Sequence, residues 1–188
     1  MNRNQTSEQA RILGISLSSR GFGYAIMEGE NRLVRYGNMV IKEDKSTRVL
    51  DHIAKLINRF QPNVLALHNV TAKGAHRHIR IKKLHRKVLA LAGKYKMKVM
   101  QHSNEELRNV LLGNEGGTKH EMAELLAKKF PDELATRLPP KRKNWMSEDA
   151  RMDIFDAVGL AVVLQSKILI LPKCLNKVTS RDCLKKCL

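Results

Sequence analysis

The order of apolar segments along the chain constrains the fold more than any single motif does. Residues 11–42 hold three short apolar runs, and turn residues separate these runs at Ser18–Gly21 and Gly29–Asn31. Runs so close together predict three strands in an antiparallel meander. Ser46 is the predicted N-cap of the next element, an amphipathic helix over 47–60.

The rest of the chain alternates between helical and strand-like patterns. These patterns predict, in order, a strand over 63–70, a helix over 78–95, a strand over 97–103, helices over 104–113 and 118–130, a loop over 131–145 and a final helix after Ser147. Strands followed by alternating helices and strands predict an α/β fold. We expect a mixed five-stranded sheet, in which a three-stranded antiparallel meander continues into parallel strands, with helices on both faces.

The final predicted helix carries three aspartates, although most of it is apolar. Asp149, Asp153 and Asp156 differ by four and by three positions, so a helix with about 3.6 residues per turn places them on one face. Like charges at these spacings repel each other, and a cation, Arg151 or the helix N-terminus would compensate. Asp149 follows a predicted N-cap at Ser147, where a carboxylate interacts favourably with the first turn.

The chain is strongly basic. Its 188 residues include 35 Lys and Arg against 18 Asp and Glu, so the formal net charge is +17. This charge favours polyanions as partners, and nucleic acid more than a membrane, because no apolar run reaches the roughly 18 residues that span a bilayer. A solvated basic surface without a specific ligand is the alternative. The polar N-terminus has no signal-peptide core, which predicts a cytoplasmic protein.

We expect one domain with two appendages. Residues 1–10 form a polar leader, 11–170 the domain and 171–188 a basic tail that contains cysteines. The cysteines of this tail are Cys174, Cys183 and Cys187. Their spacing matches no usual four-ligand zinc pattern, so free thiols in a reducing compartment are expected.

Four segments together suggest a family. They are GISLSSRGFGYAIME at 14–28, NVLALHNV at 63–70, VMQHSNEELRNVLLGNEGGTKHEMAELL at 99–126 and DIFDAVGLAVV at 153–163. In their order and spacing they resemble the RuvC-type Holliday-junction resolvases, whose fold is ribonuclease H-like. The resemblance covers about residues 11–166, most of the chain.

The resemblance implies a metal site built from four acids that hold two Mg²⁺ ions beside a DNA phosphate. Asp153 and Asp156 match the two acids of the family's last helix, whereas Ser16 and His68 stand where the family has Asp and Glu on its first and fourth strands. Lys119 matches a basic position near the scissile phosphate. Hard divalent cations need several oxygen ligands, so the loss of two carboxylates predicts weakened or lost catalysis.

Each of these residues also has a plainer interpretation. Asp153 and Asp156 are either metal ligands, a retained half-site or helix-end hydrogen-bonding groups, and His68 is either a ligand of a metal such as Zn²⁺ or a hydrogen-bonded histidine at a strand end. If catalysis persists, the expected activity is that of a metal-dependent endodeoxyribonuclease with Mg²⁺ or Mn²⁺ as cofactor.

Basic residues cluster in two places and predict phosphate contacts. They are Lys73, Arg77, Arg80, Lys82, Lys83, Arg86 and Lys87 after the fourth strand, and Lys141, Arg142 and Lys143 before the acidic helix. Trp145 follows the second cluster, where it would either stack on a base or anchor the core.

The preferred hypothesis is a nucleic-acid-binding relative of the resolvases that recognises branched or duplex DNA, DNA being favoured over RNA. An active structure-selective endonuclease with a rebuilt metal site is the second hypothesis, and a scaffold within a protein assembly is the third. A homodimer is compatible with the resemblance.

Overall fold

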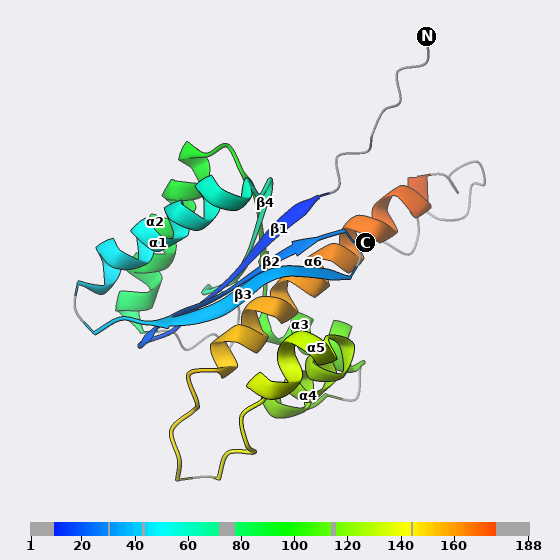
Figure 1. Cartoon of the computed structure of the whole chain (residues 1–188). Coiled ribbons are helices and arrows are strands. Elements are labelled where there is room, and N and C mark those ends of the chain that lie inside the picture. The colour runs from blue at the N-terminus through cyan, green and yellow to red at the C-terminus, as the bar shows by residue number, and fades with distance from the viewer. Residues whose placement is uncertain are drawn as a thin grey trace.

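The three N-terminal strands form the predicted antiparallel meander, and two parallel strands extend it into a single sheet. The computed structural model describes residues 10–175, except 30, 43, 72–77, 114–115 and 144. The strands are β1 (Arg11–Leu17), β2 (Gly21–Glu28), β3 (Arg32–Val40), β4 (Val64–His68) and β5 (Lys98–His102). Their order in the sheet is β3-β2-β1-β4-β5, with β4 parallel to β1 and β5 parallel to β4. The predicted mixed five-stranded sheet is therefore confirmed (Figure 1).

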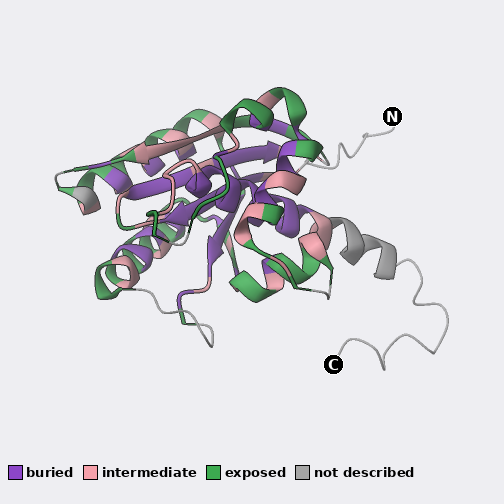
Figure 2. Cartoon of the chain, turned by 90° about the horizontal axis from the view of Figure 1, so that it is seen from below, coloured by how far each residue is buried: buried purple, intermediate pink, exposed green. Residues whose placement is uncertain are grey.

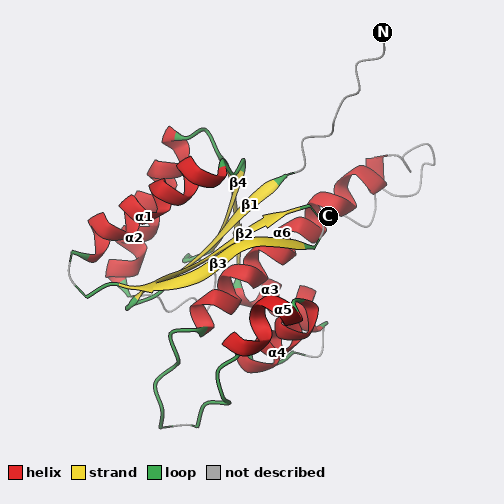
Figure 3. Ribbon diagram, in the orientation of Figure 1, coloured by secondary structure: helices red, strands yellow, loops and turns green. Residues whose placement is uncertain are grey.

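Helices cover both faces of the sheet, as predicted (Figure 3). One face carries α1 (Lys45–Phe60) and α2 (Ile79–Lys94). The other face carries α3 (Asn104–Leu112), α4 (Lys119–Lys129), α5 (Pro131–Leu134) and α6 (Met152–Leu175). Because strand side chains alternate between faces, the sheet contributes to two separate apolar cores, and buried residues concentrate along the strands and α6 (Figure 2).

The helix α6 lies directly on the sheet because glycines leave room for its backbone. A Cβ atom at Gly14 of β1 would lie 2.2 Å from the carbonyl oxygen of Ala157, and one at Gly23 of β2 would lie 1.9 Å from that of Asp153. Both distances are far below van der Waals contact. The two small residues therefore set the height of α6 above β1 and β2, and with it the position of the α6 carboxylates.

Three local predictions were wrong. α1 begins at Lys45, with Asp44 rather than Ser46 at the N-cap, and the Asp44 side chain makes no capping hydrogen bond. The predicted loop after Phe130 contains the short α5, where Pro131 at the first helical position supplies a suitable φ without needing an amide hydrogen. α6 begins at Met152, several residues after Ser147.

The predicted division into leader, domain and tail remains a prediction. α6 continues past residue 170 to Leu175. The leader up to residue 9 and the cysteines Cys183 and Cys187 lie outside the described residues. In the part of the chain that the structure describes, no helix combines the length and the apolarity needed to cross a membrane.

Candidate functional site

The carboxyl ends of the parallel strands bring three polar side chains into one row under α6. Ile15 pairs with Leu67, so the next residues, Ser16 and His68, lie side by side at the ends of β1 and β4. His68 pairs in turn with His102 of β5. Ser16, His68 and His102 are all buried. Because side chains alternate along a strand, each of the three points to the same face of the sheet as the core residues that pack against α6.

Asp153 and Asp156 of α6 lie over this row of side chains. Asp153 and Asp156 are both buried, with exposed fractions of 6% and 4%. The Ser16 hydroxyl donates a hydrogen bond to Oδ2 of Asp156 over 3.4 Å. The structure thus brings Ser16 and Asp156 into contact, although 140 residues separate them in the sequence.

Lys119 provides the cation that compensates Asp156. Its Nζ atom lies 2.7 Å from Oδ2 of Asp156 and 2.9 Å from Oε1 of Glu148. Burial by itself would lower the pKa of Lys119, but the charges and hydrogen bonds of the two carboxylates outweigh burial and raise it. Lys119 therefore stays charged and neutralises much of the negative charge at this end of α6.

The local structure that places Lys119 there is a glycine-rich turn followed by a capping box. Gly116 has φ of 76°, a left-handed conformation that glycine adopts without strain. Thr118 then caps α4 by accepting a hydrogen bond from the backbone of Glu121, whose side chain bonds back to the Thr118 amide. Lys119 is consequently fixed as the first residue of α4, facing α6.

Asp153 lacks such a cation at bonding distance among the described ion pairs. Burial raises the pKa of Asp153, and the negative charge of Asp156 adds to this effect, while the nearby Ser18 hydroxyl and the Lys119 charge oppose it. A raised pKa means that the site is a poor environment for a second negative charge.

The donor set does not fit the two divalent cations that the resemblance implies. Two hard cations in one site need several carboxylates. Here Ser16 contributes a neutral hydroxyl, and the carboxylate of Asp156 is already ion-paired to Lys119. Among the described residues, no group of three or more His, Cys, Asp or Glu side chains has an arrangement suited to a metal ion.

Asp149 acts on the backbone that leads into α6. Its Oδ1 atom accepts a hydrogen bond from the Arg151 amide at 2.8 Å, and its carboxylate pairs with the Arg151 guanidinium at the same distance. These bonds lower the pKa of Asp149. The structure therefore places Asp149 before the helix as a stabiliser of the turn, and not within its first turn as predicted.

A second polar cluster, which the sequence patterns did not reveal, lies at the end of β5. Nδ1 of His102 lies 3.1 Å from Oε2 of Glu106 on α3, and Lys167 of α6 forms an ion pair with the same glutamate. Burial lowers the pKa of His102, although Glu106 opposes that shift. One sequence feature could have revealed this cluster. Two predicted parallel strands contain His68 and His102 near their carboxyl ends, and the carboxyl ends of parallel strands lie at the same edge of a sheet.

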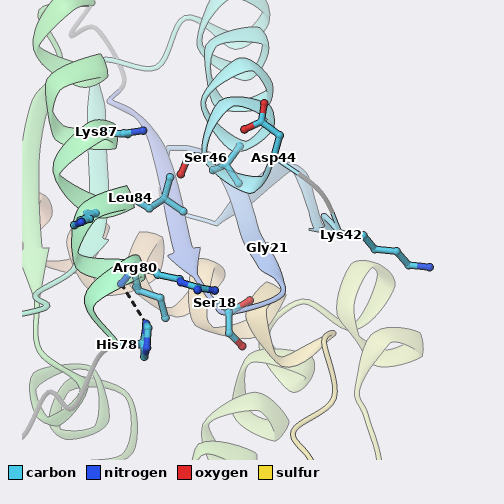
Figure 4. Close-up of a pocket in the computed structure, with 13 residues that line it drawn as sticks. Ser18, Gly21, Lys42, Asp44, Ser46, His78, Arg80, Leu84 and Lys87 are labelled. Carbon is cyan, nitrogen blue, oxygen red and sulfur yellow. Dashed lines mark hydrogen bonds between the residues drawn. The ribbon is translucent and has the colours of Figure 1, made fainter.

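The basic residues of α2 line a pocket on the other face of the sheet. This pocket of about 690 Å³ lies between α1, α2 and the β1–β2 turn, and its polar lining consists of Ser18, Ser19, Lys42, Asp44, Ser46, His78, Arg80, Lys83 and Lys87. In Figure 4, the Arg80 side chain points across the pocket toward Ser18, whereas Lys42 points away. The Arg80 amide donates to the His78 ring at 3.2 Å, which fixes the start of α2.

The other predicted basic residues are placed differently. Lys82 is half-buried and Arg86 is exposed, and neither lines the pocket. Lys73 and Arg77 lie outside the described residues. Lys141, Arg142 and Lys143 are exposed on the loop before α6, and Trp145 is 79% exposed, so the alternative in which it anchors the core is wrong.

Comparison with known proteins agrees with this architecture. Residues 12–135 match the family model described as crossover junction endodeoxyribonuclease RuvC. A curated protein of the same description from Idiomarina loihiensis is 26% identical over 130 residues, which cover 62% of this chain and 73% of that protein.

Solved resolvase structures share the fold. Thermus thermophilus RuvC has a TM-score of 0.64 at 14% identity, covering 85% of this chain and 96% of its own. The same protein in complex with a Holliday-junction substrate has a TM-score of 0.62 at 14% identity, covering 86% and 96%. The yeast mitochondrial Holliday-junction resolvase Ydc2 has a TM-score of 0.61 at 13% identity, covering 90% and 85%.

Proposed function

The chain belongs to the RuvC family of crossover junction endodeoxyribonucleases, and we propose that it is a member that binds branched or duplex DNA through phosphate contacts while its metal-dependent catalysis is weakened or lost. The observation that carries this proposal is the pair of buried, adjacent side chains Ser16 and His68, which stand where the family has two of its four acids. Only Asp153 and Asp156 remain of the carboxylates that the family's chemistry needs for its metal ions.

The electrostatics of the site support the loss of Mg²⁺ chemistry. Two Mg²⁺ ions carry four positive charges, and Ser16 and His68 remove two of the four carboxylates that would balance them. Lys119 adds a positive charge at hydrogen-bonding distance from Asp156. Two carboxylates leave too little negative charge to hold two Mg²⁺ ions against their mutual repulsion.

The α2 pocket supports the binding half of the proposal. Arg80, Lys83 and Lys87 of α2 line the pocket together with Ser18 and Ser19 of the β1–β2 turn, and these cations outnumber the one lining carboxylate, Asp44. Cationic and hydroxyl groups together are typical phosphate donors, and such contacts fix a nucleic-acid backbone without reading its sequence. The pocket adjoins the turn that contains Ser18, which also neighbours Asp153. A backbone bound in this pocket would therefore approach the acids.

The test is DNA binding measured over a range of salt concentrations. A fluorescent four-way junction and a linear duplex of the same length are titrated with the protein, and anisotropy gives the affinity. If Arg80, Lys83 and Lys87 contact phosphates, replacing all three with Ala should flatten the dependence of log K on log salt by roughly 0.9 per contact on duplex DNA.

A matched variant controls for net charge. Lys94, Lys96 and Lys98 are exposed at the last residue of α2 and just after it, so their triple replacement with Ala removes the same charge away from the pocket. We expect a smaller effect on the salt slope from this variant. Equal slopes for both triple variants would mean that only net charge matters, and absence of binding to either DNA would favour the scaffold hypothesis.

A further inference from the structure

The loop that leads into α6 is held at both ends and exposed at its tip. At its start, Pro139 is buried and Leu138 packs against the core. At its end, the Arg20 guanidinium donates to the Glu148 carbonyl, and Asn38 donates to the Ala150 carbonyl at 3.0 Å. The loop is therefore attached to the rest of the fold on both sides of its tip, and the tip projects away from the helices (Figure 1).

The tip of this loop displays the chain's single tryptophan. The Met146 amide donates to the Lys143 carbonyl at 3.0 Å, which closes a turn around Trp145. Trp145 is 79% exposed and Met146 is 49% exposed. Burial of a large indole is favourable, yet the turn presents it to solvent.

The surroundings of Trp145 indicate what would cover it. Lys141, Arg142 and Lys143 precede it and are exposed, and the Lys143 ammonium lies 5.4 Å from the centre of the indole ring. A flat aromatic face among cations matches a nucleic-acid strand, which offers phosphates to the cations and a base to the ring. A fully paired duplex keeps its bases stacked on each other, so the matching partner has an unpaired or unstacked base.

We propose that Trp145 is a stacking site, in which its indole packs against an unpaired nucleobase while Lys141, Arg142 and Lys143 bind the adjoining phosphates. This inference rests on the proposed DNA-binding function and adds a substrate feature to it. Trp145 precedes Glu148 by three residues, and Glu148 is paired with Lys119. A base held by Trp145 would thus belong to branched or single-stranded nucleic acid that is bound by the same loop that carries Glu148.

The test uses the intrinsic fluorescence of Trp145, which is unambiguous because the full chain has one tryptophan. The full-length protein is titrated with a single-stranded oligothymidine, with an abasic strand of the same length and charge, and with a four-way junction. Binding is followed in parallel by anisotropy of labelled DNA. We expect the oligothymidine and the junction to quench Trp145 emission, and the abasic strand to bind with much less quenching.

Variants give a second measurement. Trp145→Leu should weaken binding to the oligothymidine about tenfold and leave affinity for the abasic strand nearly unchanged. Trp145→Phe, which keeps an aromatic face, should recover part of the loss. Because the indole is exposed, neither change should reduce thermal stability appreciably.

Three outcomes would overturn the inference. Binding of oligothymidine without quenching would mean that Trp145 does not touch the bases, and the proposed DNA-binding function would stand. Equal quenching by the abasic strand would mean that the loop responds to a polyanion and not to a base. Absence of binding by anisotropy would overturn the DNA-binding function and this inference together.

Discussion

The Nζ atom of Lys119 lies 2.7 Å from Oδ2 of Asp156, on the acidic end of α6. The same ammonium reaches Glu148, and Ser16 donates to Asp156 from below. A family carboxylate is thus satisfied by groups of the protein itself.

Lys119→Met should destabilise the protein, because it leaves the buried Asp156 carboxylate without its cation. Breaking a fully buried pair costs about 3–5 kcal/mol. The side chain of Lys119 is 37% exposed, so we expect a loss of about 1–2 kcal/mol in the free energy of unfolding. Chemical denaturation measures it, with Lys128→Met, an exposed lysine of the same helix, as control. Equal small effects of both changes would contradict the structural role of the pair.

Asp153→Asn should stabilise the protein at neutral pH. The pKa of Asp153 is raised in the folded state by burial, so the folded protein binds more protons than the unfolded chain between the two pKa values, and stability falls as pH rises through that window. Asparagine removes this loss. Its advantage should be largest near pH 7 and vanish below about pH 4, where Asp is protonated in both states.

Asp149→Asn is the control for Asp153→Asn, because it should change the stability in the opposite direction. The pKa of Asp149 is lowered by its bonds to Arg151, so its contribution is present at neutral pH and is lost as pH falls through the folded-state pKa. This variant should be less stable than the parent at pH 7. Thermal melts of both variants are measured from pH 3 to pH 8. If both substitutions changed the melting temperature in the same direction at pH 7, the opposite pKa shifts of Asp153 and Asp149 would be contradicted.

Gly14→Ala should test the packing that positions the acids. Its Cβ would lie 2.2 Å from a backbone carbonyl oxygen of α6, and neither backbone can yield locally, so we expect a loss of about 3 kcal/mol. Gly93→Ala is the control, because no atom lies within 4 Å of its added Cβ. In helix α2 that change should be neutral or stabilising by up to about 1 kcal/mol. Equal melting temperatures for the two variants would contradict the close approach of α6 to β1.

Ser16→Asp combined with His68→Glu should restore Mg²⁺ affinity, because it rebuilds the cluster of four carboxylates. Calorimetric titration with Mg²⁺ measures the gain. Adding Asp153→Ala should remove it. As control, Ser46→Asp with His78→Glu adds the same carboxylates on the other face of the sheet, and equal Mg²⁺ affinity there would show a nonspecific charge effect.

The parts of the fold that follow hydrophobic periodicity were predictable from the sequence. The meander, the buried strand β4 and the amphipathic helices all have strong patterns, and the sheet and its two helical layers follow from their order. Ends of elements were less predictable. At α1, a left-handed Asp44 without a side-chain cap precedes the helix, and no sequence pattern marks that conformation.

The candidate site was predictable in its residues and less so in its bonds. The motifs pointed to Ser16, His68, Asp153, Asp156 and Lys119. They did not predict that Lys119 pairs with both Asp156 and Glu148, because such a contact depends on the packing of α4 against α6. The cluster of His102, Glu106 and Lys167 was missed for the same reason, since it joins three elements that are distant along the chain.

The most direct test of the central claim is a cleavage assay with the unaltered protein. A labelled four-way junction is incubated with excess protein and Mg²⁺, and parallel anisotropy verifies that the junction is bound. We expect the junction to be bound and to remain uncut. Robust Mg²⁺-dependent cleavage that Asp153→Ala abolishes would contradict the account and establish an active nuclease.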